Sequence, residues 1–311
     1  MKANEARVDR RMFLSSALAA GVAAALVRPA AALVVRRQAP RTLRKAVGLG
    51  MVDEGKTVLE KLQIVKDCGF EGVEIDRPSD VPLDELLAAQ EKSGVKIHGV
   101  VDSVHWSQPL NHPDAAVRKA GLDGLTAAIK DAKALGSVSV LLVPAVVNGD
   151  LPYDEAWTRS IAAIKEALPL AAESKVAIAV ENVWNQFRQS PLEAARYVDE
   201  LASPWAAFHF DVGNVVNYGW PEQWIRVLGK RIVKLHIKDY SRKKRNDQGL
   251  WHGFEVELGE GDANYAAVMK ALDDVGFSTA PAGNWATAEV KGGDRKRLAQ
   301  VAGQMDRLFA M

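Results

Sequence analysis

Short apolar segments alternate with longer amphipathic segments along most of this 311-residue chain. The apolar segments are bounded by glycine, proline or polar residues, which is typical of buried parallel strands. Strands are predicted over residues 46–52, 72–76, 96–101, 139–145, 177–182, 206–211, 232–239 and 285–290. Helices are predicted over residues 57–68, 82–93, 114–135, 154–173, 190–202, 221–229, 263–275 and 293–309.

This alternation predicts one α/β domain. Eight strand–helix units within about 270 residues favour a closed (β/α)₈ TIM barrel over an open doubly wound sheet. No Gly-x-Gly-x-x-Gly motif follows the first predicted strand, which argues against a dinucleotide-binding domain. Asp114, Ser190 and Asp262 stand where helix N-caps are expected. A single catalytic barrel is therefore predicted over residues 45–311.

The first 32 residues predict a twin-arginine signal peptide. Arg10 and Arg11 precede an apolar stretch from Leu14 to Val27, and small residues follow Pro29. The stretch is short for a membrane span, so no stable membrane insertion is expected after cleavage, although an uncleaved anchor is the alternative. Residues 33–44 would form a linker. We therefore expect the twin-arginine export machinery as a partner and a periplasmic or secreted mature protein.

The charge balance excludes a strongly basic nucleic-acid-binding surface. Without residues 1–32 the chain has 35 basic and 37 acidic side chains, so no nucleic-acid partner is expected. The single cysteine, Cys68, excludes an internal disulfide. A homo-oligomer is compatible with the sequence.

Four polar residues stand at the ends of the last four predicted strands: Glu181, Asp211, His236 and Glu289. The carboxyl ends of parallel barrel strands meet at one mouth, so these side chains can converge there. Three carboxylates and one imidazole suit Mn²⁺, Mg²⁺, Co²⁺ or Zn²⁺. Singly, such a carboxylate can instead cap a helix, and such a histidine can pack in the core. Their joint placement predicts one divalent metal site.

Aromatic residues near the predicted strand ends are candidates for sugar contacts. His105 and Trp106 follow the third strand, and Trp184 and Phe187 follow the fifth. Aromatic rings suit the C–H face of a sugar, although packing of the loops is the alternative.

Three other polar residues lie on predicted strands. His209 precedes the metal-ligand candidate Asp211 by two residues, which places it on the same face of the strand as a substrate or supporting contact. His98 is expected inside the barrel, and Glu74 is expected to reach the mouth or to make a structural hydrogen bond. The long loop over residues 240–261 is a candidate lid, with disorder of residues 242–248 as the alternative.

The order of the four strand-end residues resembles the xylose-isomerase-like TIM-barrel superfamily. The similar segments include residues 69–76, 210–214, 234–239 and 258–262, and the resemblance spans about residues 45–309. It is strongest to the sugar (phosphate) isomerase and epimerase branch, which includes ketose 3-epimerases and hydroxypyruvate isomerase.

The resemblance implies a cofactor and residue roles. One divalent cation, with Mn²⁺ first, would be held by the four ligands, and Glu181 and Glu289 would move the proton. Arg242 would contact substrate oxygens. Phe187 and Asn214 stand where the ketose 3-epimerases have a substrate-binding Glu and His, which argues against ketohexose 3-epimerisation specifically.

The predicted activity is that of a metal-dependent sugar isomerase or epimerase. Proton abstraction next to a carbonyl would give an enediolate from a free sugar, keto-sugar or small hydroxy-carbonyl compound. One alternative is a metal-dependent lyase or hydrolase that acts on an oxidised sugar or glycoside. The other is a non-catalytic sugar-binding barrel.

Overall fold

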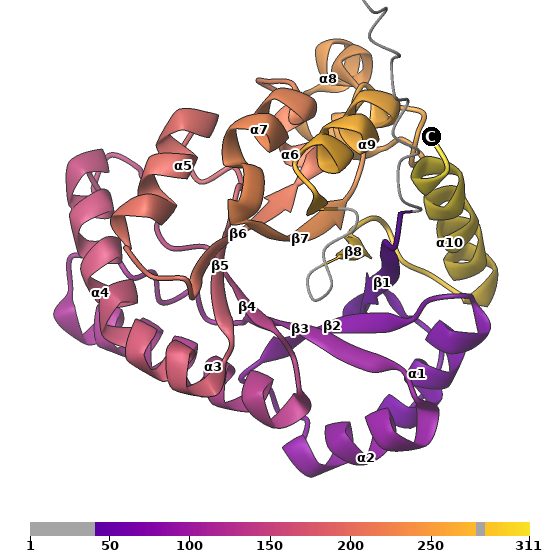
Figure 1. The fold of residues 1–311 in the computed structure, drawn as a ribbon, viewed down its shortest axis with the longest axis horizontal. Coiled ribbons are helices and arrows are strands. Elements are labelled where there is room, and N and C mark those ends of the chain that lie inside the picture. The colour runs from indigo at the N-terminus through magenta and orange to yellow at the C-terminus, as the bar shows by residue number, and fades with distance from the viewer. Residues whose placement is uncertain (1–40, 278–283) are drawn as a thin grey trace, which may run out of the picture. The chain divides into compact units, whose positions relative to one another are not determined.

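The structure is a computed structural model, and it describes residues 41–277 and 284–311. The predicted signal peptide and most of the predicted linker lie outside the described residues. The described residues form a closed barrel in which eight parallel strands follow one another in chain order (Figure 1). The strands are β1 Arg44–Gly48, β2 Gly72–Arg77, β3 Lys96–Asp102, β4 Ser139–Leu142, β5 Ala177–Glu181, β6 Ala206–Asp211, β7 Ile232–Ile237 and β8 Trp285–Ala288.

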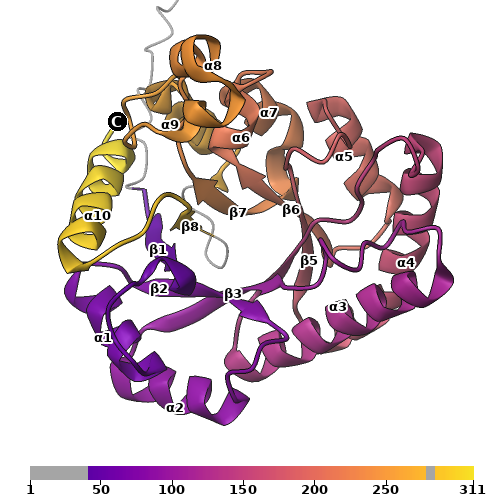
Figure 2. The same cartoon turned by 180° about the vertical axis from the view of Figure 1, so that it is seen from behind.

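Helices cover the outside of the barrel, as both views show (Figures 1 and 2). The α-helices are α1 Val58–Asp67, α2 Leu83–Ser93, α3 Ala115–Leu135, α4 Tyr153–Ser174, α5 Pro191–Glu200, α6 Val212–Val216, α7 Pro221–Leu228, α8 Arg242–Gln248, α9 Tyr265–Asp274 and α10 Arg295–Phe309. Short 3₁₀ helices are η1 Leu49–Met51, η2 Gly229–Arg231 and η3 Leu250–Phe254. The predicted TIM barrel is thereby confirmed. In the described part of the chain, no helix has the length and apolarity needed to span a membrane.

Helix caps explain where several helices begin. The side chains of Asp114 and Ser190 accept hydrogen bonds from the first turns of α3 and α5, as predicted. The predicted cap at Asp262 is wrong: Asn264 caps α9, because its side chain accepts from the Ala267 amide. The Asp262 carboxylate instead accepts from the Arg242 amide at 2.6 Å and so fixes the start of α8.

Parallel pairing between the first and last strands closes the barrel. Arg44 pairs with Trp285, and the register continues to Val47 opposite Ala288. Most of the buried apolar side chains form one cluster that includes residues of strands and helices alike. β8 also pairs with β7, with Ile237 opposite Ala288, and this pairing places the carboxyl ends of the two strands side by side at the candidate site.

The inside of the barrel contains a polar layer below the mouth. Lys234 is fully buried and hydrogen-bonds to His98 Nδ1, and also to the His98 carbonyl oxygen at 2.9 Å. The Oγ1 atom of Thr287 lies 3.2 Å from His98 Nε2. Burial lowers the pKa of Lys234 to about 7. His98 therefore lies inside the barrel, as the sequence predicts.

Candidate metal centre

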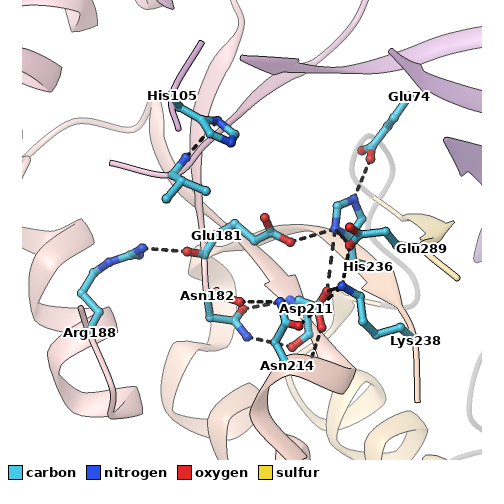
Figure 3. A network of polar contacts seen from close by, with 11 residues as sticks. Glu74, His105, Glu181, Asn182, Arg188, Asp211, Asn214, His236, Lys238 and Glu289 are labelled. Carbon is cyan, nitrogen blue, oxygen red and sulfur yellow. Dashed lines mark hydrogen bonds and ion pairs between the residues drawn. The ribbon is translucent and has the colours of Figure 1, made fainter. Parts of the chain in front are cut away.

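The four strand-end residues meet at the barrel mouth. Glu181 ends β5, Asp211 ends β6, His236 lies near the end of β7, and Glu289 directly follows β8. Each offers one ligand atom, and these atoms all lie within 4.8 Å of one another. Figure 3 shows the four side chains converging from their separate strands.

The distances suit a single small cation. His236 Nδ1 lies 2.8 Å from Glu181 Oε1, 2.8 Å from Glu289 Oε2 and 3.9 Å from Asp211 Oδ2. Ligand atoms that each lie about 2.1 Å from one cation are roughly 3 Å apart when they are at right angles. The donor set of three carboxylates and one imidazole therefore fits a divalent ion in both chemistry and spacing.

The two carboxylate oxygens of Asp211 have separate environments. Oδ1 accepts a 2.6 Å hydrogen bond from the Asn214 amide and thereby caps α6. Oδ2 is buried without a hydrogen bond to any described residue. A buried carboxylate oxygen without a hydrogen bond is costly, and a cation would stabilise it more than the nearby Lys238 ammonium does alone. Asp211 therefore caps α6 with one oxygen and leaves the other oxygen facing the cluster.

An asparagine clamp fixes the backbone of Asp211. Asn182 Oδ1 accepts from the Asp211 amide at 2.9 Å, and Asn182 Nδ2 donates to the Asp211 carbonyl at 2.8 Å. Asn214 Nδ2 donates in turn to the Asn182 carbonyl at 3.0 Å. These bonds tie the ends of β5 and β6 together, so that two of the ligands are held in register.

Arg188 supports Glu181 from behind. Its Nη2 donates to the Glu181 carbonyl at 2.6 Å, and its buried guanidinium lies over the rings of Tyr197 and Phe208. Burial raises the pKa of the Glu181 carboxyl, since its charged form is poorly solvated. No motif in the sequence singles out Arg188.

Lys238 is a site residue that the sequence reasoning missed. Its Nζ lies 3.1 Å from Asp211 Oδ2, without hydrogen-bond geometry, and 2.9 Å from Glu289 Oε2. It stands two residues after His236, so strand alternation places both side chains on the same face. That spacing was the available signal.

Burial and neighbouring charges shift the pKa values of the ionisable groups in the cluster. Burial raises the pKa of Asp211 to about 7. Burial opposes the charged form of His236, but the carboxylates Glu289, Glu181 and Glu74 raise its pKa well above the usual value. A site that draws a protonated imidazole and an ammonium group toward its carboxylates has the potential to attract a divalent cation.

Of three further predicted residues, His209 and Asn214 lie close to this cluster, and His105 lies near the end of β4. The ring of His209 packs against that of His236, with centroids 4.1 Å apart. Asn214 belongs to the asparagine clamp described above. His105 is buried, and its Nδ1 accepts from the Val143 amide at 3.4 Å. This bond leaves Nε2 as the protonated nitrogen, since burial lowers the His105 pKa to about 4 and keeps the ring neutral.

An aromatic cluster lies beside the metal centre. Trp184 donates from Nε1 to the Asn214 carbonyl at 2.8 Å, and its ring lies 4.9 Å from Trp251 and 5.0 Å from Phe254. Lys238 Nζ approaches the Phe254 ring to 5.4 Å. Trp251 is 68% exposed, so η3 presents an open aromatic face to solvent.

Phe187 and Arg242 both make contacts within the protein. Phe187 does not line a pocket: it is buried, with its ring 5.1 Å from Tyr153 and 5.6 Å from Tyr197. The Arg242 guanidinium donates to the carbonyls of Val216 and Gly219, and its contact with substrate stays a prediction.

Two further expectations concern Trp106 and the candidate lid. Trp106 is half-exposed and packs edge-on against His105, with ring centroids 5.5 Å apart. Residues 242–248 form helix α8, so the alternative of disorder in the candidate lid is wrong.

Comparison with known proteins decides the family. Residues 62–308 match the family described as xylose isomerase-like TIM barrel. This chain belongs to the xylose isomerase-like TIM barrel family. Within it, the chain is 29% identical over 231 residues to a putative L-ribulose-5-phosphate 3-epimerase, SgbU, of Escherichia coli (strain K12), with 70% of this chain and 80% of that protein covered.

Other members are similar over more of the chain. The L-ribulose-5-phosphate 3-epimerase UlaE of Salmonella paratyphi A is 27% identical over 251 residues, which cover 76% of this chain and 86% of that protein. The solved D-allulose 3-epimerase from Methylomonas sp. in complex with D-allulose has a TM-score of 0.68 at 18% identity, over 86% of this chain and 97% of that chain. Within the xylose isomerase-like TIM barrel family, the chain is thus similar to sugar epimerases, as the sequence predicts.

Proposed function

We propose that this protein is a divalent-cation-dependent sugar epimerase or isomerase that moves a proton next to a carbonyl group. The observation that carries the proposal is the convergence of Glu181, Asp211, His236 and Glu289 within 4.8 Å at the barrel mouth. The epimerase relatives support this reaction class.

The proposed ligands have different roles in the reaction. A divalent cation bound here would polarise the substrate carbonyl and so make the neighbouring C–H more acidic. Asp211 has one oxygen committed to the cap of α6, so it holds its position and takes no proton from the substrate. Glu181 and Glu289 act as the two proton-transferring groups, because they approach the cluster from different strands, β5 and β8.

Exposure separates the two glutamates. The Glu181 side chain is 7% exposed, whereas that of Glu289 is 49% exposed. Glu289 therefore exchanges its proton with solvent more readily than Glu181. Return of a proton to the opposite face of the same carbon gives epimerisation, and return to the neighbouring carbon gives isomerisation.

The substrate that we propose is a free sugar, keto-sugar or small hydroxy-carbonyl compound. A sugar phosphate would need an available cationic group, and the basic residues of α8 are engaged within the protein. Arg242 and Arg245 donate to backbone carbonyls, Lys243 pairs with Asp247, and Lys244 donates to the Glu255 carbonyl. His105 Nε2–H and the Trp251 ring are the proposed contacts for sugar hydroxyls and C–H faces.

We further propose Mn²⁺ as the cation and a periplasmic or secreted location for the mature protein. Mn²⁺ suits the carboxylate-rich donor set. Export rests on Arg10 and Arg11 and the apolar stretch that follows them. Fusion of residues 1–45 to a reporter that folds before export tests this location, and retention in the cytoplasm would contradict it.

Solvent-deuterium incorporation tests the reaction. The Mn²⁺-loaded protein is incubated in D₂O with L-ribulose, D-allulose and L-ribulose 5-phosphate, and the carbon-bound protons are followed by NMR. We expect exchange into free L-ribulose that is abolished in Glu181→Gln and Glu289→Gln, and little or none into the ketohexose D-allulose. Glu255→Gln, an exposed substitution on the same side of the barrel, is the matched control and retains exchange.

The same assay distinguishes the alternatives. Exchange accompanied by loss of a substituent would identify a lyase. Exchange only into the phosphate ester would overturn the substrate and leave the reaction class intact. Absence of exchange from every carbonyl sugar, with the cation bound, would contradict catalysis and leave a sugar-binding barrel.

A further inference from the structure

We infer that Glu74 is a positioning residue for the metal centre, which fixes the tautomer and the orientation of the ligand His236. This inference rests on the proposed metal centre and adds a residue outside the four ligands. Glu74 lies on β2, across the barrel mouth from the strands that supply the ligands, as Figure 3 shows.

The contact is short and buried. Glu74 Oε2 lies 2.8 Å from His236 Nε2, and both residues are at most 5% exposed. The opposite ring nitrogen, Nδ1, faces Glu181 and Glu289 at 2.8 Å each. The imidazole therefore spans the space between one carboxylate on β2 and the ligand cluster.

This arrangement selects one form of the neutral ring. A carboxylate accepts a hydrogen bond, so Glu74 stabilises the proton on Nε2. The lone pair then lies on Nδ1, which is the nitrogen that faces the other ligands. A carboxylate behind a ligand histidine also raises the basicity of the ring and holds its plane. Glu74 thus holds the ring so that Nδ1 is the nitrogen that His236 presents to a cation.

A glycine at position 99 leaves room for the Glu74 side chain. Gly99 on β3 lies beside it, and a Cβ atom at position 99 would come within 2.7 Å of Glu74 Oε1 and 3.0 Å of its Cγ. A Cβ contact shorter than 3 Å forces the neighbour to move. A Gly99→Ala substitution would therefore displace the Glu74 carboxylate without removing it.

A second metal site is the competing explanation for these residues. Ligand atoms of Glu74, His209 and His236 also lie within 4.8 Å of one another, and His209 Nε2 is buried without a hydrogen bond to a described residue. However, His236 Nε2 cannot both donate a proton to Glu74 and bind an ion. The positioning role predicts one cation per chain, whereas a second site predicts two.

Titration of the cation-free protein with Mn²⁺ tests the role. Free Mn²⁺ is measured by electron paramagnetic resonance at a fixed pH. We expect one ion per wild-type chain and binding about 10–100-fold weaker in Glu74→Leu. Gly99→Ala should also weaken Mn²⁺ binding. Glu74→Gln retains an acceptor oxygen, so its Mn²⁺ affinity should lie between those of the wild type and Glu74→Leu. Glu91→Gln on the exposed surface of α2 is the matched control.

A second readout is independent of affinity. In protein labelled with ¹⁵N-histidine and loaded with diamagnetic Zn²⁺, His236 should show a slowly exchanging Nε2–H signal that is lost in Glu74→Leu. Circular dichroism identifies any variant that has not folded. If Glu74→Leu does not fold, the test is made with Glu74→Gln and Gly99→Ala.

The outcomes separate this inference from the proposed function. Wild-type protein that binds no Mn²⁺ would remove the metal centre itself. One bound ion with unchanged affinity in Glu74→Leu and Gly99→Ala would overturn the positioning role alone. Two ions in the wild type and one in Glu74→Leu would replace it with a second metal site.

Discussion

At the scale of single residues, the ligands depend on neighbours that the sequence does not mark. Asp211 could be predicted from its place at the end of a strand, but Asn182 could not, because a single asparagine after a strand has many ordinary roles. Lys238 follows from strand alternation once His236 is fixed. Phe187 was misplaced because one residue in a loop can turn toward the core or the mouth, and its sequence position does not distinguish these directions.

The asparagine clamp gives the first prediction. Asn182→Ala removes both side-chain hydrogen bonds to the buried backbone of Asp211. The free energy of unfolding should fall by about 1–3 kcal/mol, and Mn²⁺ binding should weaken because Asp211 loses its fixed backbone. Urea unfolding measures the first effect. Asn246→Ala, which removes an exposed asparagine from α8, should change neither quantity; equal losses in both variants would contradict the clamp.

A buried carboxyl outside the metal centre gives a pH prediction. Asp102 ends β3, its Oδ2 has no hydrogen bond among the described residues, and burial raises its pKa to about 7. A raised pKa in the folded state means that stability is full below the unfolded pKa of about 3.9 and is lost as the pH rises through about 7. The cost of the ionised form should therefore appear between pH 4 and pH 8.

Asp102→Asn removes that titration. The stability of the variant relative to the wild type should rise by up to about 4 kcal/mol from pH 4 to pH 8. Chemical unfolding at a series of pH values measures the difference. Asp150→Asn, in an exposed loop, is the matched control and should give a flat profile. A flat profile for Asp102→Asn as well would show that the carboxyl is not buried in solution.

At the scale of elements, the periodicity predicted all eight strands and the eight long helices. Long periodic segments are well determined because they each bury an apolar face. The short elements α6 and α8 were not predicted, since their existence depends on tertiary partners. Asp211 caps α6 only because β6 ends there, and Asp262 holds the start of α8 from 20 residues away.

The η3 turn gives a prediction at this scale. Gly253 packs against the ring of Tyr240, where a Cβ atom would approach ring carbons to 2.3 Å. Tyr240 also donates from its hydroxyl to the Leu250 carbonyl at 2.8 Å. Gly253→Ala should therefore displace η3 together with Trp251. If η3 contributes to sugar binding, KM for the sugar should rise several-fold while Mn²⁺ affinity stays unchanged.

Steady-state kinetics and the Mn²⁺ titration together check this prediction. Gly149→Ala is the matched control, because no atom lies within 4 Å of its added Cβ. An unchanged KM in a correctly folded Gly253→Ala variant would mean that η3 lies outside the sugar site.

At the scale of the whole molecule, barrel closure brings together residues that are far apart in the chain. Pairing of β1 with β8 completes a ring in which Glu74 from β2 faces His236 from β7, 162 residues away. The sequence predicted the barrel and its mouth, and from these the gathering of the four strand ends. It could not predict which side chains face each other across the mouth, because that depends on the stagger of the strands.

The most direct test of the account is anomalous diffraction from crystals grown with Mn²⁺. We expect one strong peak at the barrel mouth, within bonding distance of Glu181, Asp211, His236 and Glu289, with Glu74 hydrogen-bonded to Nε2 of His236. A peak elsewhere, or no peak in crystals that diffract well and contain the ion, would contradict it.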